Sequence, residues 1–136
     1  MKKHFLLFTV ILCCFLGGCG NSNQATVDVL ETCKVINSTI TETSISEDKE
    51  YFTITFENGL FYCEDKTSSY TVYTIKIPAD KEFDMFAILT SIAPTLTEEN
   101  FNKLEENNEV SFLKEYRNNW HCYKSIEGDT IKYVLK

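Results

Sequence analysis

Hydrophobic and polar residues alternate along the middle of the chain. The segment from Tyr51 to Glu64 contains two alternating runs on either side of Asn58-Gly59, the pair most typical of a two-residue β-hairpin turn. That turn would place Phe56 opposite Phe61 and Ile54 opposite Cys63. The expected core face of this hairpin then holds Phe52, Ile54, Phe56, Phe61 and Cys63, and its other face holds Tyr51, Thr53, Thr55 and Tyr62.

The alternation continues on both sides of this hairpin. A third run, Tyr70 to Ile77, predicts another strand of the same meander, with Tyr73, Ile75 and Ile77 pointing inward. Upstream, Thr26 to Ile36 also predicts a strand. The Ser/Thr-rich stretch 37–46 follows it, and because Ile40 and Ile45 fall on opposite parities, a strand there needs a bulge or bend.

After Pro78 the hydrophobic period changes from that of a strand to that of a helix. Met85, Ile88, Leu89 and Ile92 recur at helical spacing, which predicts a well-buried helix. We expect Asp80 to cap its N-terminus and Pro94 to end it.

A second helix is predicted from near Thr95 or Thr97 to about Asn108. Phe101 and Leu104 share one side of this helix. Its acidic residues are expected on the opposite, solvent-facing side: Glu98, Glu99, Glu105, Glu106 and Glu109.

The C-terminal part returns to strand patterns. Residues 110–116 fit a helix or a strand equally well, whereas Trp120 to Ile126 and Thr130 to Leu135 predict a hairpin around Glu127-Gly128-Asp129. Together these segments predict an α+β fold, in which an antiparallel sheet (a meander plus a C-terminal hairpin) has two helices packed on one face.

The N-terminus has the layout of an export signal. Lys2 and Lys3 precede the apolar run 5–16 and the small residues Gly17 and Gly18. The run is shorter than the roughly 20 apolar residues that a spanning helix needs. Leu16-Gly17-Gly18-Cys19 resembles the lipobox of bacterial lipoprotein precursors, although the place of Gly17 more often holds Ala, Ser, Thr or Val. The alternative is a conventional secretory signal with an incidental cysteine.

The resemblance implies three segments. Residues 1–18 would be a lipoprotein signal peptide, residues 19–25 a lipidated cysteine with a short polar tether, and residues 26–136 a single α+β domain. In this class Cys19 receives a diacylglyceryl group and becomes the N-terminus after cleavage. The expected location is therefore the outer face of the bacterial cytoplasmic membrane, or the outer membrane where the source has one.

Charge narrows the choice of partners. Removing residues 1–18 leaves 11 basic and 20 acidic residues, a net charge of −9. Because nucleic-acid binders present a basic face, nucleic acid is excluded as an expected partner. We expect a non-catalytic binding or sequestering role, with a cationic peptide, a toxin or an envelope protein as the partner. An immunity or exclusion function is suggested by analogy with small lantibiotic-immunity lipoproteins, without a residue motif.

Two surfaces are candidates for that binding. The first is the row of carboxylates on the second helix, which could equally be a solvated face. The second is the face formed by Tyr51, Thr53, Thr55 and Tyr62, whose residues are also good strand formers.

The signal for catalysis or metal binding is poor. His121 and Cys122 are neighbours on a predicted strand and leave it by opposite faces, which argues against a Cys/His dyad and against a shared zinc ion. We therefore expect no enzyme, metal or cofactor, and keep a cell-wall hydrolase as the alternative. Cys63 and Cys122 are each expected to be a small buried hydrophobe. Of the three disulfides possible among Cys33, Cys63 and Cys122, the pair Cys63–Cys122 is weakly preferred.

Overall fold

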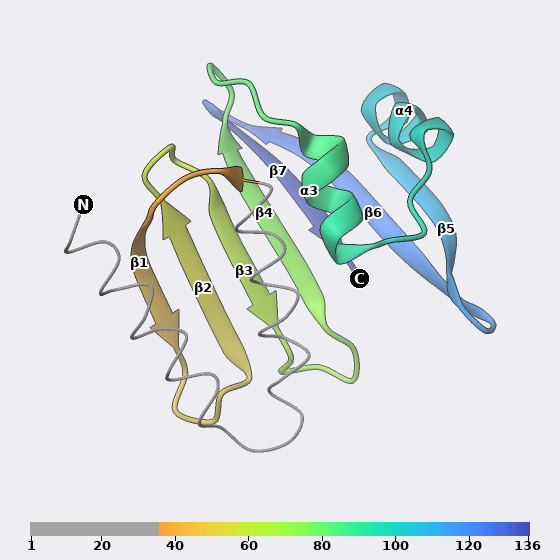
Figure 1. The fold of residues 1–136 in the computed structure, drawn as a ribbon. Coiled ribbons are helices and arrows are strands. Elements are labelled where there is room, and N and C mark those ends of the chain that lie inside the picture. The colour runs from red at the N-terminus through yellow and green to blue at the C-terminus, as the bar shows by residue number, and fades with distance from the viewer. Residues whose placement is uncertain (1–35) are drawn as a thin grey trace.

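A seven-stranded antiparallel sheet with two helices on one face makes up the computed structural model, which describes residues 36–136 (Figure 1). The predicted signal peptide, Cys19, Cys33 and the predicted strand up to residue 35 lie outside the described residues. The strands are β1 (Ile40–Ile45), β2 (Tyr51–Phe56), β3 (Phe61–Asp65), β4 (Val72–Pro78), β5 (Glu109–Glu115), β6 (Asn118–Glu127) and β7 (Thr130–Leu135), and the helices are α3 (Met85–Ile92) and α4 (Glu98–Asn107).

The sheet consists of two meanders joined side by side. Its strand order is β1-β2-β3-β4-β7-β6-β5, and every neighbouring pair is antiparallel. Both helices belong to the connection between β4 and β5, and they lie over the same face of the sheet (Figure 1). This arrangement confirms the predicted α+β class.

The β2–β3 hairpin differs from its predicted register by one residue. The Phe56 N–H donates to the Leu60 carbonyl at 2.8 Å, so the loop contains three residues, Glu57 to Gly59, and not two. Gly59 has φ 91°, the left-handed position of a three-residue loop with a bulge. Ile54 consequently pairs with Tyr62, and Thr55 with Phe61.

This shift exchanges the two faces of β3. Tyr62 lies in the core with 1% exposure, whereas Phe61 and Cys63 lie on the face away from the helices. The predictions for Phe61, Cys63 and Tyr62 were therefore wrong. The predicted inward positions on β2, namely Phe52, Ile54 and Phe56, are confirmed by their burial.

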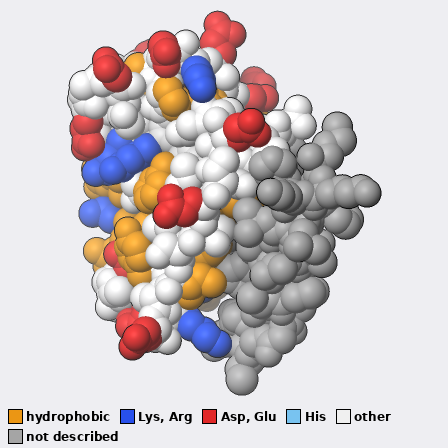
Figure 2. Space-filling model, turned by 90° about the vertical axis from the view of Figure 1, so that its left-hand side faces the viewer, with side chains coloured by type: hydrophobic (Ala, Val, Ile, Leu, Met, Phe, Trp, Pro, Cys, Tyr) orange, Lys and Arg blue, Asp and Glu red, His pale blue; other side chains and the backbone are white. Residues whose placement is uncertain are grey.

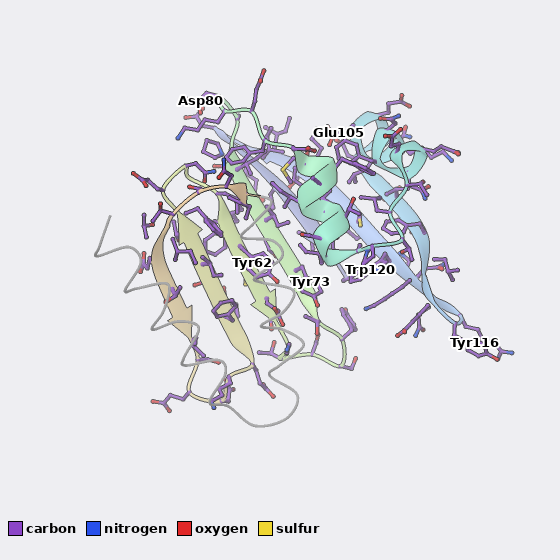
Figure 3. All side chains as sticks on the ribbon, viewed as in Figure 1. Tyr62, Tyr73, Asp80, Glu105, Tyr116 and Trp120 are labelled. Atoms are coloured by element: carbon purple, nitrogen blue, oxygen red, sulfur yellow. The ribbon has the colours of Figure 1, made fainter. Side chains whose placement is uncertain are left out.

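The core fills the space between the sheet and its helical cover. β2, β3, β4 and β6 each contribute one aromatic ring to a row, with centroid separations of 6.4 Å for Phe52–Tyr62, 6.5 Å for Tyr62–Tyr73 and 5.9 Å for Tyr73–Trp120. Figure 3 labels Tyr62, Tyr73 and Trp120. Such contacts stabilise a core beyond the area that they bury. Ile75 and Ile77 are buried on β4, as their alternation predicts.

Both helices have capping residues, although α3 begins later than expected. The Asp84 carboxylate accepts from the Ala87 N–H at 3.1 Å, so Asp84 caps α3 and the prediction of Asp80 was wrong. The four residues predicted to form the buried stripe, Met85, Ile88, Leu89 and Ile92, are all buried. In α4 Thr97 is the cap, the second of the two predicted starts.

The remaining strands complete the sheet. Residues 109–115 form β5, which resolves the ambiguous segment as a strand. The predicted C-terminal hairpin is confirmed, with a two-residue loop in which Gly128 has φ 62°. In β1 the pairing shifts between Ile40 and Glu42, which is the irregularity that the parity of its isoleucines predicts.

Candidate functional site

A pocket of about 430 Å³ opens between α4, the segment that leads into α3, and the sheet. Its apolar wall includes three phenylalanines, and the rings of Phe86 and Phe101 lie 5.6 Å apart. Its charged lining consists of three carboxylates, Glu82, Asp84 and Glu105, and two ammonium groups, Lys81 and Lys124. An aromatic cavity with a few convergent polar groups is the usual form of a small binding site.

Glu105 is the best-held polar group of this pocket. The Lys124 ammonium lies 2.5 Å from its Oε2, and the Tyr133 hydroxyl donates to its Oε1 at 2.7 Å. Tyr133 is buried, and its pKa is raised by that burial and by the neighbouring carboxylate. Glu105 (Figure 3) therefore joins α4 to β6 and β7, and the prediction that it faces solvent with the other acids was wrong.

The other four carboxylates of the predicted set are exposed, and we call Glu98, Glu99, Glu106 and Glu109 the acidic face. Glu99 pairs with Lys103 at 2.7 Å, and this hydrogen bond lowers its pKa. Within residues 36–136, the other three form no ion pair. The acidic face thus keeps three carboxylates without an ion-pair partner among the described residues.

The second predicted binding surface lies only partly on one face of the sheet, the face away from the helices. Tyr51, Thr53 and Thr55 lie there, but Tyr62 is on the opposite side, so the structure does not bring the four together. The Cys63 thiol is hydrogen-bonded to Tyr51 and raises the pKa of that tyrosine. From the β1 side, Figure 2 shows acidic, basic and hydrophobic side chains intermixed, with no continuous field of one sign.

The cysteines do not form the preferred disulfide. Cys63 lies on β3 and Cys122 on the core face of β6, with β4 and β7 between these strands. Three strand spacings amount to about 14 Å, about twice the Cα separation that a disulfide spans. Both thiols are free and buried, and burial raises the pKa of Cys122 to about 12.

His121 lies on the open face of β6, where its Nδ1 is 2.9 Å from the Ser111 hydroxyl oxygen. Cys122 points to the other side, as the strand geometry predicts. In the described part of the chain, no carboxylate is bonded to this imidazole and no group of three or more His, Cys, Asp or Glu residues could hold a metal ion. Within the described residues, His121 therefore lacks the carboxylate that orients the base in a hydrolytic triad.

A broader depression of about 830 Å³ lies at the end of the sheet, beside the β2–β3 and β6–β7 turns. Its lining includes Phe61, Lys76, Pro78 and Asp129. The Lys76 ammonium is 5.7 Å from the centre of the Phe61 ring.

The comparisons with known proteins identify no relative. No family model matches the chain, and neither a curated protein nor a solved structure matches it. Among the helices of residues 36–136, none has the length and hydrophobicity to cross a membrane.

Proposed function

We propose that the chain is a lipid-anchored extracytoplasmic lipoprotein that binds a cationic peptide, or a cationic segment of an envelope protein, without catalysing a reaction. The observation that carries this proposal is the combination of carboxylates and phenyl rings in one pocket. Glu82 and Asp84 line it together with Phe86 and Phe101. A lysine or arginine side chain gains from both groups, through ion pairing and through contact with an aromatic face.

The acidic face supports the same kind of partner. Glu98 and Glu106 are on α4, the helix that supplies Phe101 to the pocket, and neither carboxylate is compensated by a described cation. Exposed carboxylates of this kind accelerate the encounter with a basic ligand, which then binds in the pocket.

The anchoring part of the proposal rests on Leu16-Gly17-Gly18-Cys19. We expect the wild-type chain to fractionate with membranes and to carry acyl mass on Cys19, and Cys19→Ser to lack that mass. Membrane fractionation and mass spectrometry of the N-terminal peptide measure both. Equal fractionation of the two proteins, with no acyl mass on either, would refute the anchor.

The binding part is tested with two variants of equal charge. One replaces Glu98, Glu106 and Glu109 by Gln, and the control replaces Glu42, Glu47 and Glu50, which are exposed residues of β1 and the β1–β2 loop. With full-length protein in phosphatidylcholine vesicles and a short peptide of lysine and leucine, we expect the first variant to slow association by about tenfold at low salt. The control should associate nearly as fast as wild type.

The dependence of the association rate on salt is the second measurement of this experiment. Raising the ionic strength shortens the Debye length to below about 8 Å, so it should reduce the wild-type rate and bring the two variants together. If both variants slow association equally, the net charge and not the acidic face attracts the peptide. If the peptide does not bind to wild type, the proposed partner class is wrong.

A further inference from the structure

The tip of the β5–β6 hairpin exposes apolar side chains to solvent. Tyr116 is 88% exposed, the highest value among the exposed large hydrophobic side chains of the described chain, and Leu113 on the adjoining strand is 60% exposed. Figure 3 shows Tyr116 projecting past the end of the sheet. A single exposed hydrophobe needs no explanation, but an exposed tyrosine and leucine at a projecting turn form a contact surface.

Two cations accompany these side chains. Arg117, the only arginine in the sequence, has its guanidinium carbon 5.9 Å from the centre of the Tyr116 ring. Lys114 places its ammonium 4.0 Å from the centre of the Trp120 ring. Residues 113–119 contain these two cations and one acid, Glu115. This segment is therefore positive, although the chain has a net charge of −7.

The turn at this tip contains a left-handed residue and an irregular strand pairing. Arg117 has φ 72°, a left-handed conformation for which the β2–β3 and β6–β7 turns use Gly59 and Gly128. The pairing of β5 with β6 is interrupted between Leu113 and Glu115. Next to the turn, the Thr95 hydroxyl donates to the Leu113 carbonyl at 2.6 Å, which ties this end of the hairpin to the α3–α4 connection.

We propose that this tip, formed by Leu113, Lys114, Tyr116 and Arg117, contacts the surface of an anionic lipid bilayer. The inference rests on the membrane location in the proposed function. A guanidinium forms two parallel hydrogen bonds with a phosphate, and tyrosine side chains favour the depth of the lipid headgroups. Basic residues next to a membrane are attracted by anionic lipids, and this attraction fades within a Debye length.

The charge of the remaining domain favours the same orientation. An anionic bilayer repels the acidic surface and attracts the positive tip. The tip lies at the far end of β5 from α4 (Figure 1), so an orientation with the tip on the lipid points the acidic face away from it.

The test uses a tryptophan as a depth probe. Trp120 is the only tryptophan, so Trp120→Phe provides a silent background for Tyr116→Trp at the tip. Ile126→Trp is the matched control, because the Ile126 side chain is 69% exposed and lies near the opposite end of β6 from the tip. Full-length protein is reconstituted in phosphatidylcholine vesicles with and without phosphatidylglycerol, and quenching by lipids brominated near the headgroup is measured.

We expect the tip probe to be quenched at least twice as strongly as the control in phosphatidylglycerol vesicles. Arg117→Gln should remove most of this difference. Lys49→Gln should leave it intact, since Lys49 is also exposed and left-handed (φ 61°) but lies in the β1–β2 loop.

Equal quenching of the two probes, or none at the tip, would overturn the inference. If the tip probe responds to an added envelope protein and not to lipid, the surface is a protein-binding site and the lipid proposal is wrong. Flotation of the vesicles distinguishes the two proposals. An unquenched tip on protein that still floats rejects only the tip contact, whereas loss of flotation rejects the membrane anchor and the tip contact together.

Discussion

Cys122 combines burial in the core with an ionisable thiol. Burial raises its pKa from about 9 to about 12 because a thiolate is poorly solvated in the core. Between these values the unfolded chain loses its proton while the folded chain keeps it. The contribution of this thiol to stability is therefore complete below pH 9 and declines as the pH rises toward 12.

This predicts an alkaline loss of stability that depends on one residue. The free energy of unfolding of the wild type should fall by about 2 kcal/mol more between pH 9 and 11 than that of Cys122→Ala. Urea unfolding at several pH values measures the difference. Tyr133, whose pKa is also raised, adds to the slope above pH 10 in both proteins and so cancels in the comparison. Equal slopes would show that the Cys122 thiol ionises as readily in the folded state as in the unfolded one.

Residue by residue, the sequence predicts only part of the pocket. Glu105 follows Phe101 by four residues, a spacing that places both on one side of a helix, so its inward position could have been predicted. Its partners could not. Lys124 and Tyr133 come from strands 19 and 28 residues further along, and no local pattern pairs them with α4.

At the scale of elements, the sequence pattern predicts the β2–β3 hairpin but not its register. Both strands and the position of the turn follow from the sequence, but Asn58-Gly59 fits a two-residue and a three-residue loop alike. The choice between them decides which side of β3 is buried, because a shift of one residue reverses the faces.

The register leads to a direct prediction. Tyr62→Ala should lower the free energy of unfolding by about 3–5 kcal/mol, and Phe61→Ala by clearly less, because Tyr62 is 1% exposed while Phe61 is only half-buried on the open face. Chemical denaturation of the two variants measures this order. The reverse order would restore the register of a two-residue turn.

Two glycines in turns provide a matched pair. Both have positive φ, so alanine at either position is strained by about 1–2 kcal/mol. A Cβ on Gly59 would also lie 2.7 Å from Pro78 Cγ, whereas a Cβ on Gly128 has nothing within 4 Å. We expect Gly59→Ala to lower the thermal midpoint more than Gly128→Ala, and equal shifts would show that Pro78 gives way without cost.

The start of α3 was decided by tertiary contacts. Asp80 and Asp84 are equally suitable capping residues in the sequence. The Lys81 ammonium donates to the Asn58 carbonyl at 3.0 Å, which ties the segment after β4 to the β2–β3 turn before the helix begins. A cap predicted from composition alone therefore falls one turn too early.

On the scale of the whole molecule, the pairing of β4 with β7 unites the two meanders. Six residue pairs, from Tyr73–Leu135 to Pro78–Thr130, join them. The meander β1–β4 follows from short-range patterns, but nothing in the sequence indicates that β7 and not β5 lies beside β4. Long-range pairing of this kind depends on the packing of the complete core.

Because β4 and β7 join the two meanders, we expect the meanders to unfold together. In native-state hydrogen exchange, the amides of β4 and β7 should open only with global unfolding, and those of the edge strands β1 and β5 at lower free energy. Ile75→Ala, which removes a side chain with no exposed surface from β4, should reduce protection in both meanders by about 2–5 kcal/mol. Faster exchange in β1–β4 alone would show that the meanders are separate cooperative units.

In the export that we propose for this chain, the central place of β7 affects the order in which the protein can fold. A chain that crosses a membrane from its N-terminus presents β1 to β4 first, and β4 then has one unpaired edge. That edge is covered only when β7, the last strand in sequence, has emerged. Nearly the whole domain must therefore be translocated before the sheet can close, and during this interval the half-formed sheet is most vulnerable to envelope proteases and to aggregation.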